Sequence, residues 1–495
     1  MRASLLTLML ALAGLAAQAA ELKLEPVKPT PVAANPEAGK KLYARWCAQC
    51  HGLEGKGDGP AAEFVYPRPR DFTLALYKVR TTPSGQLPTD HDLFKAISVG
   101  LPGTSMPAWE KFIGEEDRWQ LVHHLKTFDS LGLFKEEAPK QQLVVSGAPK
   151  VDDALIAHGK QVYQDKKCGK CHGQYGRGDG QSAPGMKDDW GYPIRPVNYT
   201  KPWIYRGGAS LEDIYRTFTT GFNGTPMPSF ADTIVEADRW ALAAYVKSLT
   251  REISGGQVVK ARYHEGELPA KPDDPAWNDA PRLDAQLAGQ IVLEPRQFKP
   301  GNDMVSARAL YNGKEVALLV TWDDGTNNLG TDGKPVDQVA LQLPLEQDTG
   351  TEKPYFLLGD RAHPVDHWRW NAAQGLARQV FAGHDQATPR DTQGLTATGD
   401  YKDGQYRVVF RRALQGRSGE LAFAPGAFVP IAFQAWDGEQ GDEGLKMAMS
   451  SWYSLLLEPP TPFTVYLWPL GIGFIALGGE VWLLRRSRRK HQSPE

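Results

Sequence analysis

Cysteine is scarce in this chain, and its placement is more informative than its number. Only 4 of the 495 residues are cysteine. They fall in two short segments, as Cys47 with Cys50 and as Cys168 with Cys171. No cysteine is left over for a separate framework of disulfides elsewhere in the chain. The chemistry of the thiols is therefore confined to these two segments.

An excess of charge of either sign is also absent. The formal net charge is −2, and 23% of the residues are charged. A protein that binds nucleic acid through its phosphates needs a basic surface, and this balance gives no sign of one. We therefore expect no nucleic-acid partner and no strongly acidic partner. A length of 495 residues predicts several domains rather than one core.

Long apolar runs are few, and the first is too short to cross a membrane. It extends from Leu5 to Leu15, behind the basic Arg2 and ahead of the small-residue pattern Ala17-Gln18-Ala19. This order is typical of a secretory signal peptide, here residues 1–20. The alternative is a retained anchor. Export from the cytoplasm is the expectation that follows.

The second apolar run lies near the C-terminus, from Phe463 to Leu484. About 22 helical residues are enough to cross about 30 Å of hydrocarbon. Arginine and lysine follow at once in the basic tail 485–495, which predicts a cytoplasmic C-terminus. The sequence therefore predicts one transmembrane helix over 463–484, a location in the bacterial inner membrane, and the bulk of the chain in the periplasm.

Each cysteine pair belongs to a Cys-x-x-Cys-His motif, completed by His51 in the first copy and His172 in the second. This motif is the attachment signature of c-type haem, in which two thiols form thioethers and the histidine reaches the iron. A single Cys-x-x-Cys pair would also fit a redox dithiol, a zinc knuckle or a disulfide. Two copies, each followed directly by histidine, favour two covalent haems c.

A second iron ligand is expected in each copy, and methionine commonly supplies it. The chain offers Met106 in Gly103-Thr104-Ser105-Met106-Pro107 and Met227 in Gly224-Thr225-Pro226-Met227-Pro228. The two copies are in register, because three pairs of equivalent positions are each 121 residues apart: Cys47 and Cys168, Met106 and Met227, Trp119 and Trp240. The first half of the chain is therefore a tandem repeat.

These motifs resemble the class I cytochrome c domain, present twice over residues 36–130 and 153–250. The resemblance implies a small bundle of helices around each haem, and it implies that a proline carbonyl holds the proximal histidine ring. Local patterns agree with helices that lead into each motif and helices that close each domain. We expect them at these positions: 37–43, 157–163, 117–128 and 238–249. Residues 21–35 are predicted to be a flexible lead-in.

Beyond about residue 256 the pattern changes to short alternating strands, which predicts an all-β sandwich. Asn312-Gly313 and Asp403-Gly404 are turn pairs between such strands. The predicted strands lie at these positions: 290–293, 306–311, 316–322, 339–343, 406–412 and 429–436. The fold class is therefore two all-α cytochrome c domains, one all-β sandwich and one C-terminal transmembrane helix.

Residues 262–458 resemble the haem-b-binding gamma subunit of ethylbenzene dehydrogenase and related periplasmic molybdoenzymes. The resemblance rests on motifs that occur in one order, at 274–277, 321–324, 363–370, 435–438 and 446–453. It implies a non-covalent haem b between a lysine, here Lys446, and a methionine. This chain has Leu357-Leu358-Gly359 where the family's methionine is expected.

Three outcomes follow from that departure. His363 is the first choice for the opposite ligand, since it lies just past the leucines, and His367 is the second. A methionine elsewhere is another candidate: Met304, Met447 or Met449. In the third outcome the domain binds no haem and only docks a partner.

These features predict a membrane-anchored electron-transfer cytochrome. Iron with both axial positions filled leaves no open site for a substrate, so we expect a relay rather than a stand-alone enzyme. The expected partners are a membrane quinol-oxidising complex and a periplasmic oxidoreductase or terminal reductase. The alternatives are a dihaem enzyme such as a peroxidase, and a dihaem cytochrome whose sandwich is only a docking module.

Overall fold

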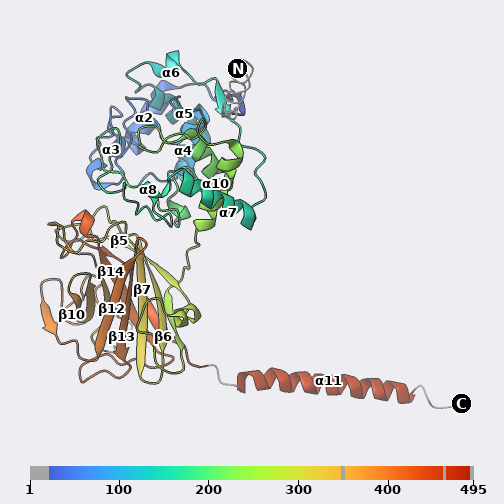
Figure 1. Cartoon of the computed structure of the whole chain (residues 1–495), viewed down its shortest axis with the longest axis vertical. Helices are drawn as coiled ribbons and strands as arrows, with labels where there is room; N and C mark the ends of the chain where they lie inside the picture. The colour runs from blue at the N-terminus through green and yellow to red at the C-terminus, as the bar shows by residue number, and fades with distance from the viewer. Residues whose placement is uncertain (1–21, 347–351, 461–463, 491–495) are drawn as a thin grey trace, which may run out of the picture.

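The structure is a computed structural model that describes residues 22–346, 352–460 and 464–490. Two helical units lie together at one end, a β domain lies beside them, and a single long helix extends from the β domain (Figure 1). The predicted signal peptide, residue Phe463 and the last five residues of the basic tail lie outside the described residues.

The first helical unit is built around two crossing helices, α2 (Pro36–Trp46) and α5 (Glu115–Lys126). Gly39 lies at the crossing, where an added Cβ would be 2.6 Å from the carbonyl oxygen of Gln120. Only glycine allows the two backbones to approach so closely. The haem-type motif forms a short helix, α3 (Ala48–His51), directly after α2. A further helix, α4 (Asp90–Val99), packs on α5 and completes the unit.

The second unit repeats this plan with α7 (Asp153–Asp165) and α10 (Glu236–Leu249). Gly159 marks the crossing, and an added Cβ would be 1.9 Å from the carbonyl oxygen of Ala241. The second motif forms α8 (Gly169–His172), and α9 (Leu211–Thr220) is the equivalent of α4. The predicted helices are therefore confirmed in both units, with ends that differ by a few residues.

The segments outside the repeat are more ordered than the sequence predicted. A strand in the lead-in, β1 (Leu24–Pro26), pairs antiparallel with β2 (Gln141–Leu143) in the linker between the two units. The linker also holds a short helix, α6 (Leu133–Glu136). The prediction of a flexible lead-in over 21–35 is wrong at β1, because a partner strand more than one hundred residues away supplies its backbone hydrogen bonds.

The β domain holds two sheets that share one core. One sheet has the strand order β16-β3-β6-β7-β13-β12 and the other β11-β10-β9-β8-β14. Strand β14 joins them, since its first half pairs with β16 and its second half with β8. The strands are β3 (Val258–Tyr263), β4 (Leu283–Gln286), β5 (Ala288–Gly289), β6 (Met304–Tyr311), β7 (Glu315–Asp323), β8 (Gln338–Pro344), β9 (Val365–Asn371), β10 (Gly375–Phe381), β11 (Ala387–Arg390), β12 (Leu395–Lys402), β13 (Gln405–Ala413), β14 (Phe428–Trp436), β15 (Ala448–Met449) and β16 (Tyr453–Leu457).

Aromatic side chains fill the space between the sheets. Trp322 on β7 and Trp370 on β9 come from different sheets, and their ring centroids are 6.4 Å apart. Both belong to one buried cluster that also contains Trp368, Phe410 and Phe433. The alternation of buried and exposed residues along strands such as β12 and β13 directs one face of each sheet to this core.

Most predicted strands and both predicted turns are confirmed, and one strand is not. Asn312-Gly313 connects β6 to β7, and Asp403-Gly404 connects β12 to β13. Residues 290–293 are not a strand. The side-chain oxygen of Gln290 accepts hydrogen bonds from the backbone N–H groups of Val292 and Leu293 at 2.6 and 2.8 Å. This local turn competes with strand pairing.

The C-terminal helix α11 (Thr464–Lys490) stands apart from the other elements (Figure 1). Among the described residues it is the one helix long and apolar enough to cross a membrane, over Leu467–Arg486. None of that segment is buried against the protein. Trp468 and Trp482, near its two ends, are 76% and 56% exposed.

Candidate functional site

The two motif histidines are held by the same kind of contact. Nδ1 of His51 lies 3.0 Å from the carbonyl oxygen of Arg70, and Nδ1 of His172 lies 3.2 Å from that of Val197. A hydrogen on Nδ1 leaves Nε2 with a free lone pair, which is the form that binds iron. The expectation of a proline carbonyl is wrong in both units. The acceptor is the residue after the proline in each unit, since the proline carbonyls lie against Gly57 and Gly178 instead, where an added Cβ would be 2.6 and 2.7 Å away.

Each motif helix ends in a conformation that only glycine adopts easily. Gly52 and Gly173 have φ values of 75° and 78°, which are strained for other residues. Their carbonyl oxygens accept hydrogen bonds from buried tyrosines, Tyr43 at 2.8 Å and Tyr163 at 2.6 Å. The tyrosines lie on α2 and α7, so the helix before each motif fixes the chain that follows its histidine.

The four thiols are free cysteines rather than disulfides. Burial raises the pKa of Cys47 to about 12 and that of Cys168 to about 11. Within the described ranges, the three-residue groups of potential metal ligands include no cysteine. The zinc-knuckle alternative therefore has no preformed set of ligands at either motif.

The two methionine loops have the same internal hydrogen bonds. The backbone N–H of Met106 donates to Oγ1 of Thr104 at 3.1 Å, and this hydroxyl donates to the carbonyl of Leu101 at 2.7 Å. The second loop repeats both contacts at Met227 and Thr225, at 3.2 and 2.9 Å. A threonine two residues before each methionine therefore shapes both loops in the same way, which supports equivalent roles for the methionines.

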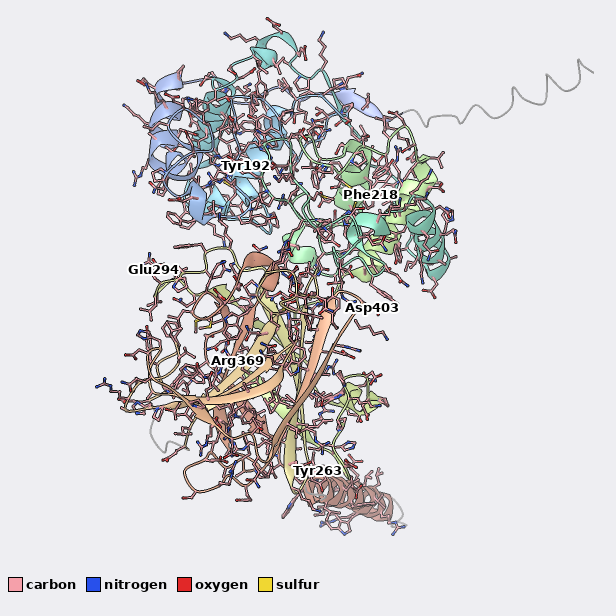
Figure 2. The ribbon with its side chains drawn as sticks, turned by 60° about the vertical axis from the view of Figure 1, so that its left-hand side comes forward. Tyr192, Phe218, Tyr263, Glu294, Arg369 and Asp403 are labelled. Atoms are coloured by element: carbon pink, nitrogen blue, oxygen red, sulfur yellow. The ribbon has the colours of Figure 1, made fainter. Side chains whose placement is uncertain are left out.

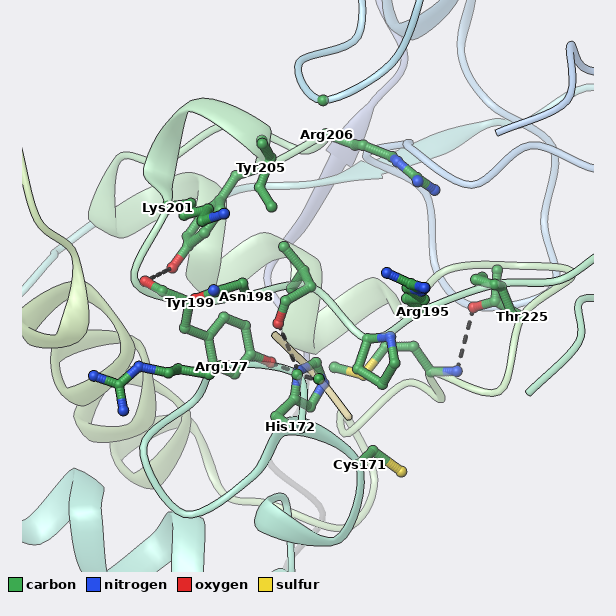
Figure 3. A pocket seen from close by; sticks show the side chains of 18 of the residues that line it. Cys171, His172, Arg177, Arg195, Asn198, Tyr199, Lys201, Tyr205, Arg206 and Thr225 are labelled. Atoms are coloured by element: carbon green, nitrogen blue, oxygen red, sulfur yellow. Dashed lines mark hydrogen bonds between the residues drawn. The ribbon is translucent and has the colours of Figure 1, made fainter. Parts of the chain in front are cut away.

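A cavity of about 500 Å³ lies in the second unit, between its motif and its methionine loop (Figure 3). Cys168, Cys171, His172 and Met227 all line it. The structure thus brings the predicted ligands of the second unit to one cavity. Much of the remaining lining is apolar: Tyr199, Tyr205, Ile214, Phe218, Leu242 and Val246. A large apolar cavity that joins two thiols, an imidazole and a thioether fits a covalent haem.

Tyr199 defines the histidine side of this cavity. Its ring stacks on His172 with centroids 4.3 Å apart, and its hydroxyl lies 3.1 Å from Nε2 of the histidine. The equivalent contact in the first unit is Phe72, stacked on His51 at 4.6 Å. His172 and Tyr199 both line the cavity, and iron binding at Nε2 of His172 would displace the Tyr199 hydroxyl.

The cavity lies where three parts of the chain meet, which no motif in the sequence indicated. Its lining includes Lys78 from the first unit and Asp303 and Asp323 from the β domain. Lys201 of the second unit is 8% exposed and its Nζ lies 2.5 Å from Asp303 and 3.8 Å from Asp323. Arg195 also reaches the β domain, 3.4 Å from Asp437. Buried ion pairs therefore join the second unit to the β domain at the cavity.

The loops at one end of the β domain make this junction. Figure 2 shows Asp403 at the end that faces the helical units and Tyr263 at the opposite end. The carbonyl of Asp403 accepts a hydrogen bond from Arg177 at 2.6 Å. Arg177 also lies 3.5 Å from Asp323. The turn between β12 and β13, which the sequence identified only as a turn, is therefore part of the interface.

Three buried carboxylates gather beneath the same interface. Oxygens of Asp324, Asp337 and Asp437 all lie within 4.8 Å of one another. Burial and the neighbouring carboxylates raise the pKa of Asp324 well above its usual value. Burial raises the pKa of Asp337 to about 6. Two of the three, Asp324 and Asp437, also line the cavity of the second unit.

The residues predicted to hold haem b are placed in two different loops. Nζ of Lys446 donates to the carbonyls of Gln440 and Gly441, at 2.5 and 3.1 Å, and lies 3.5 Å from Asp442. Iron binding by this amine would break all three contacts. His363 lies 3.5 Å from the carboxylate of Asp360.

The region where the family's methionine is expected is filled with side chains. Leu357 and Leu358 are buried in one cluster with Trp436, Met447 and Met449. His367, the second candidate, is buried and its Nε2 lies 2.7 Å from the side-chain oxygen of Gln434. The haem b of residues 262–458 stays a prediction.

Three family models match three separate parts of the chain. A cytochrome c family model matches residues 156–250, and a model of cbb3-type cytochrome c oxidase subunit III matches residues 34–125. A model of the ethylbenzene dehydrogenase family matches residues 274–394. The fold and the two Cys-x-x-Cys-His sites define this class of protein as a multihaem c-type cytochrome. Its helical units are cytochrome c domains, which implies covalent haem c, and its β domain is of the ethylbenzene dehydrogenase gamma type.

Individual relatives cover parts of the chain. The cbb3-type cytochrome c oxidase subunit CcoP of Rhodobacter capsulatus is 28% identical over 268 residues, which are 48% of this chain and 72% of that protein. A chain of the reducing HAO-like protein complex of Kuenenia stuttgartiensis is 44% identical to this chain. The match covers 46% of this chain and 100% of that chain, with a TM-score of 0.42. A family 9 carbohydrate-binding module from Caldicellulosiruptor kristjanssonii is 10% identical, with a TM-score of 0.26 over 41% of this chain and 97% of that chain.

Proposed function

We propose that the chain carries two covalent haems c and relays electrons between redox partners. The observation that supports this most strongly is the repetition of one complete ligand set in two units. His51 and His172 have the same carbonyl contact, and Met106 and Met227 have the same loop geometry. When bound, each haem supplies an iron that changes oxidation state by one electron.

The protein side of each site performs the positioning. Cys47 and Cys50, or Cys168 and Cys171, would attach the haem by thioethers, and the histidine would bind the iron from one side. The carbonyl at Nδ1 sets the orientation of the ring and increases the basicity of Nε2. The methionine would bind from the other side, which favours ferrous iron and raises the reduction potential.

This ligand set supports electron transfer over catalysis. An enzyme such as a dihaem peroxidase needs one iron with a free or easily displaced ligand. Met227 lines the same cavity as His172, so it would be available as the second protein ligand of the iron. Binding of CO to the ferrous protein separates the two functions. Fast and stoichiometric binding at one haem would favour the enzyme, and slow or absent binding agrees with the relay.

The decisive experiment is the mass of the mature protein from a host that attaches haem c. We expect the mass of two haems above that of the polypeptide, and a pyridine haemochrome spectrum of c type. Changing Cys168 and Cys171 to serine should leave one haem, and the matched change of Cys47 and Cys50 should leave the other. A bare polypeptide mass for the unchanged chain would contradict the proposal.

We further propose that α11 anchors the protein in the bacterial inner membrane with its bulk in the periplasm. The apolar segment Leu467–Arg486, with arginines after it, supports this topology. The tether would keep the haems near a membrane quinol-oxidising complex as one partner. A periplasmic oxidoreductase or terminal reductase would be the other.

A further inference from the structure

Three cationic side chains gather where the two helical units touch. Arg70 and Lys78 belong to the first unit and Arg206 to the second. Asp188 is paired with Lys78, and its Oδ2 lies 3.4 Å from Nζ of the lysine. Both of these side chains are only 11% exposed. Asp188 also acts on Arg70 and Arg206, and Asp71 acts on Arg70. Three positive charges therefore face two carboxylates.

Burial and mutual repulsion both act on the cations of this cluster. Burial, together with the positive charges of Arg70 and Arg206, lowers the pKa of Lys78 to about 8, although Asp188 acts in the opposite direction. Burial also lowers the pKa of Arg70 to about 10, and the positive charge of Arg206 contributes to this shift. An anion bound beside these cations would favour their charged forms.

Two buried donors beside the cluster also lack a partner. Within the part of the chain that the structure describes, Nε1 of Trp190 and the hydroxyl of Tyr77 are buried and make no hydrogen bond. The guanidinium of Arg70 lies 4.1 Å from the ring centroid of Trp190, and Nζ of Lys78 lies 5.6 Å from it. Neither Trp190 nor Tyr77 lines the cavity, so the cations that do, Lys78 and Arg206, carry the inference.

The cluster is connected to both haem sites. The carbonyl of Arg70 holds His51, while Lys78 and Arg206 line the cavity that contains His172 and Met227. Figure 3 shows Arg206 and Cys171 on opposite sides of that cavity. Trp190 also touches the loop of Met227, since a Cβ on Gly224 would lie 2.5 Å from its ring. A carboxylate at the edge of a haem in this cavity would therefore find cations from both units.

We propose that this junction binds propionate carboxylates of the haem in the second unit, and that Lys78 of the first unit is a positioning residue for that haem. This inference rests on the proposed binding of haem c at His172. Each haem carries two propionates, and Lys78 and Arg206 both line the cavity in which they would lie. The first unit thus completes the second haem site, and the charge of Lys78 stabilises the ferrous state of that haem.

The test is a spectroelectrochemical titration of the full-length holoprotein and its Lys78→Met variant. The second haem is identified by Met227→His, which lowers its potential. In Lys78→Met we expect the equilibrium constant for reduction of the second haem to fall about tenfold, or about 60 mV, because a nearby positive charge is lost. Lys78→Arg keeps the positive charge, so its second haem should have a midpoint potential close to that of the unchanged protein.

Lys95 provides the matched control. Its Nζ lies 3.8 Å from Asp213 of the second unit, so Lys95→Met also removes a lysine between the units, but Lys95 does not line the cavity. We expect no change of either potential. Arg206→Met removes the other cation that lines the cavity and should lower the same potential, which provides a second variant if Lys78→Met is unstable.

Two results would overturn the inference while the proposed function stands. One is an unchanged potential of the second haem in both Lys78→Met and Arg206→Met, with two haems still present by pyridine haemochrome. The other is a potential of the unchanged protein that follows the concentration of inorganic phosphate, which would identify a free anion at the junction. Loss of haem c from the unchanged chain would instead contradict the proposed function itself.

Discussion

The carbonyl oxygen of Arg70 accepts a hydrogen bond from Nδ1 of His51 at 3.0 Å. The guanidinium of the same arginine lies 4.1 Å from the ring centroid of a tryptophan in the other helical unit. One residue thus orients the first histidine with its backbone and contacts the second unit with its side chain. The two haem sites are therefore linked by direct contacts as well as by the chain between them.

Replacing Met106 by alanine should affect only the first haem. Oxidised haem with methionine as a ligand has a weak sulfur-to-iron absorption band at the red end of the spectrum. We expect the variant to lose about half of this band and to show one lowered midpoint potential, since the soft thioether favours ferrous iron. Met227→Ala, the equivalent change in the second unit, should instead lower the other potential. Two unchanged potentials in Met106→Ala would exclude Met106 as a ligand.

Removal of residues from 463 onward should release the protein from the membrane. Helix α11 is exposed over its whole apolar segment, so its loss leaves no core unfilled. We expect a soluble cytochrome with the visible spectrum of the full chain. Fractionation of cells that express either form measures this. A truncated protein that still sediments with membranes after a salt wash would count against α11 as the anchor.

Asp324→Asn should stabilise the protein at neutral and higher pH. The folded state binds a proton at Asp324 more tightly than the unfolded state does. The contribution of this group to the stability of the folded state is therefore greatest below its ordinary pKa of 3.8, and it declines as the pH rises above that value. Asparagine is neutral throughout and keeps an oxygen for the backbone N–H of Thr326. We expect the Tm to rise by about 2 °C or more at pH 8.

The pH dependence is the diagnostic part of that prediction. The difference in Tm between Asp324→Asn and the unchanged protein should shrink as the pH falls toward 4, where the aspartate becomes neutral in both states. The same change at the exposed Asp273 should have no effect at any pH. A lower Tm for Asp324→Asn at pH 8 would show that the charge is compensated, for example by a bound cation.

The β domain provides the prediction with the greatest risk. We predict one extractable haem b in the full-length protein, with Lys446 as a ligand and His363 opposite it. Acid-acetone treatment removes haem b and leaves haem c attached, so it counts the two types separately. Lys446→Ala and His363→Ala should each abolish the low-spin b-type signal. An extract without haem would instead show that the β domain is a docking module.

The ligand sets were predictable because their information is local. Cys-x-x-Cys-His places two thiols and an imidazole on one helical turn. The tandem repeat then identifies the methionine that lies at the equivalent position in each copy. Helix α10 and strand β13 were also predictable, because their apolar residues follow the period of a helix and of a strand. The local signal failed at 290–293, where one glutamine side chain takes the hydrogen bonds that a strand would need.

Contacts between distant residues decided the rest. Which carbonyl holds each histidine depends on where the backbone turns after Pro69 and Pro196, and no pattern in those segments specifies it. The pairing of β1 with β2 joins segments more than one hundred residues apart. Lys78 also comes from a distant part of the chain to the cavity of His172. Sequence periodicity reports the environment of a residue along its own element, whereas the neighbours that balance its charge come from whichever elements the fold packs against it.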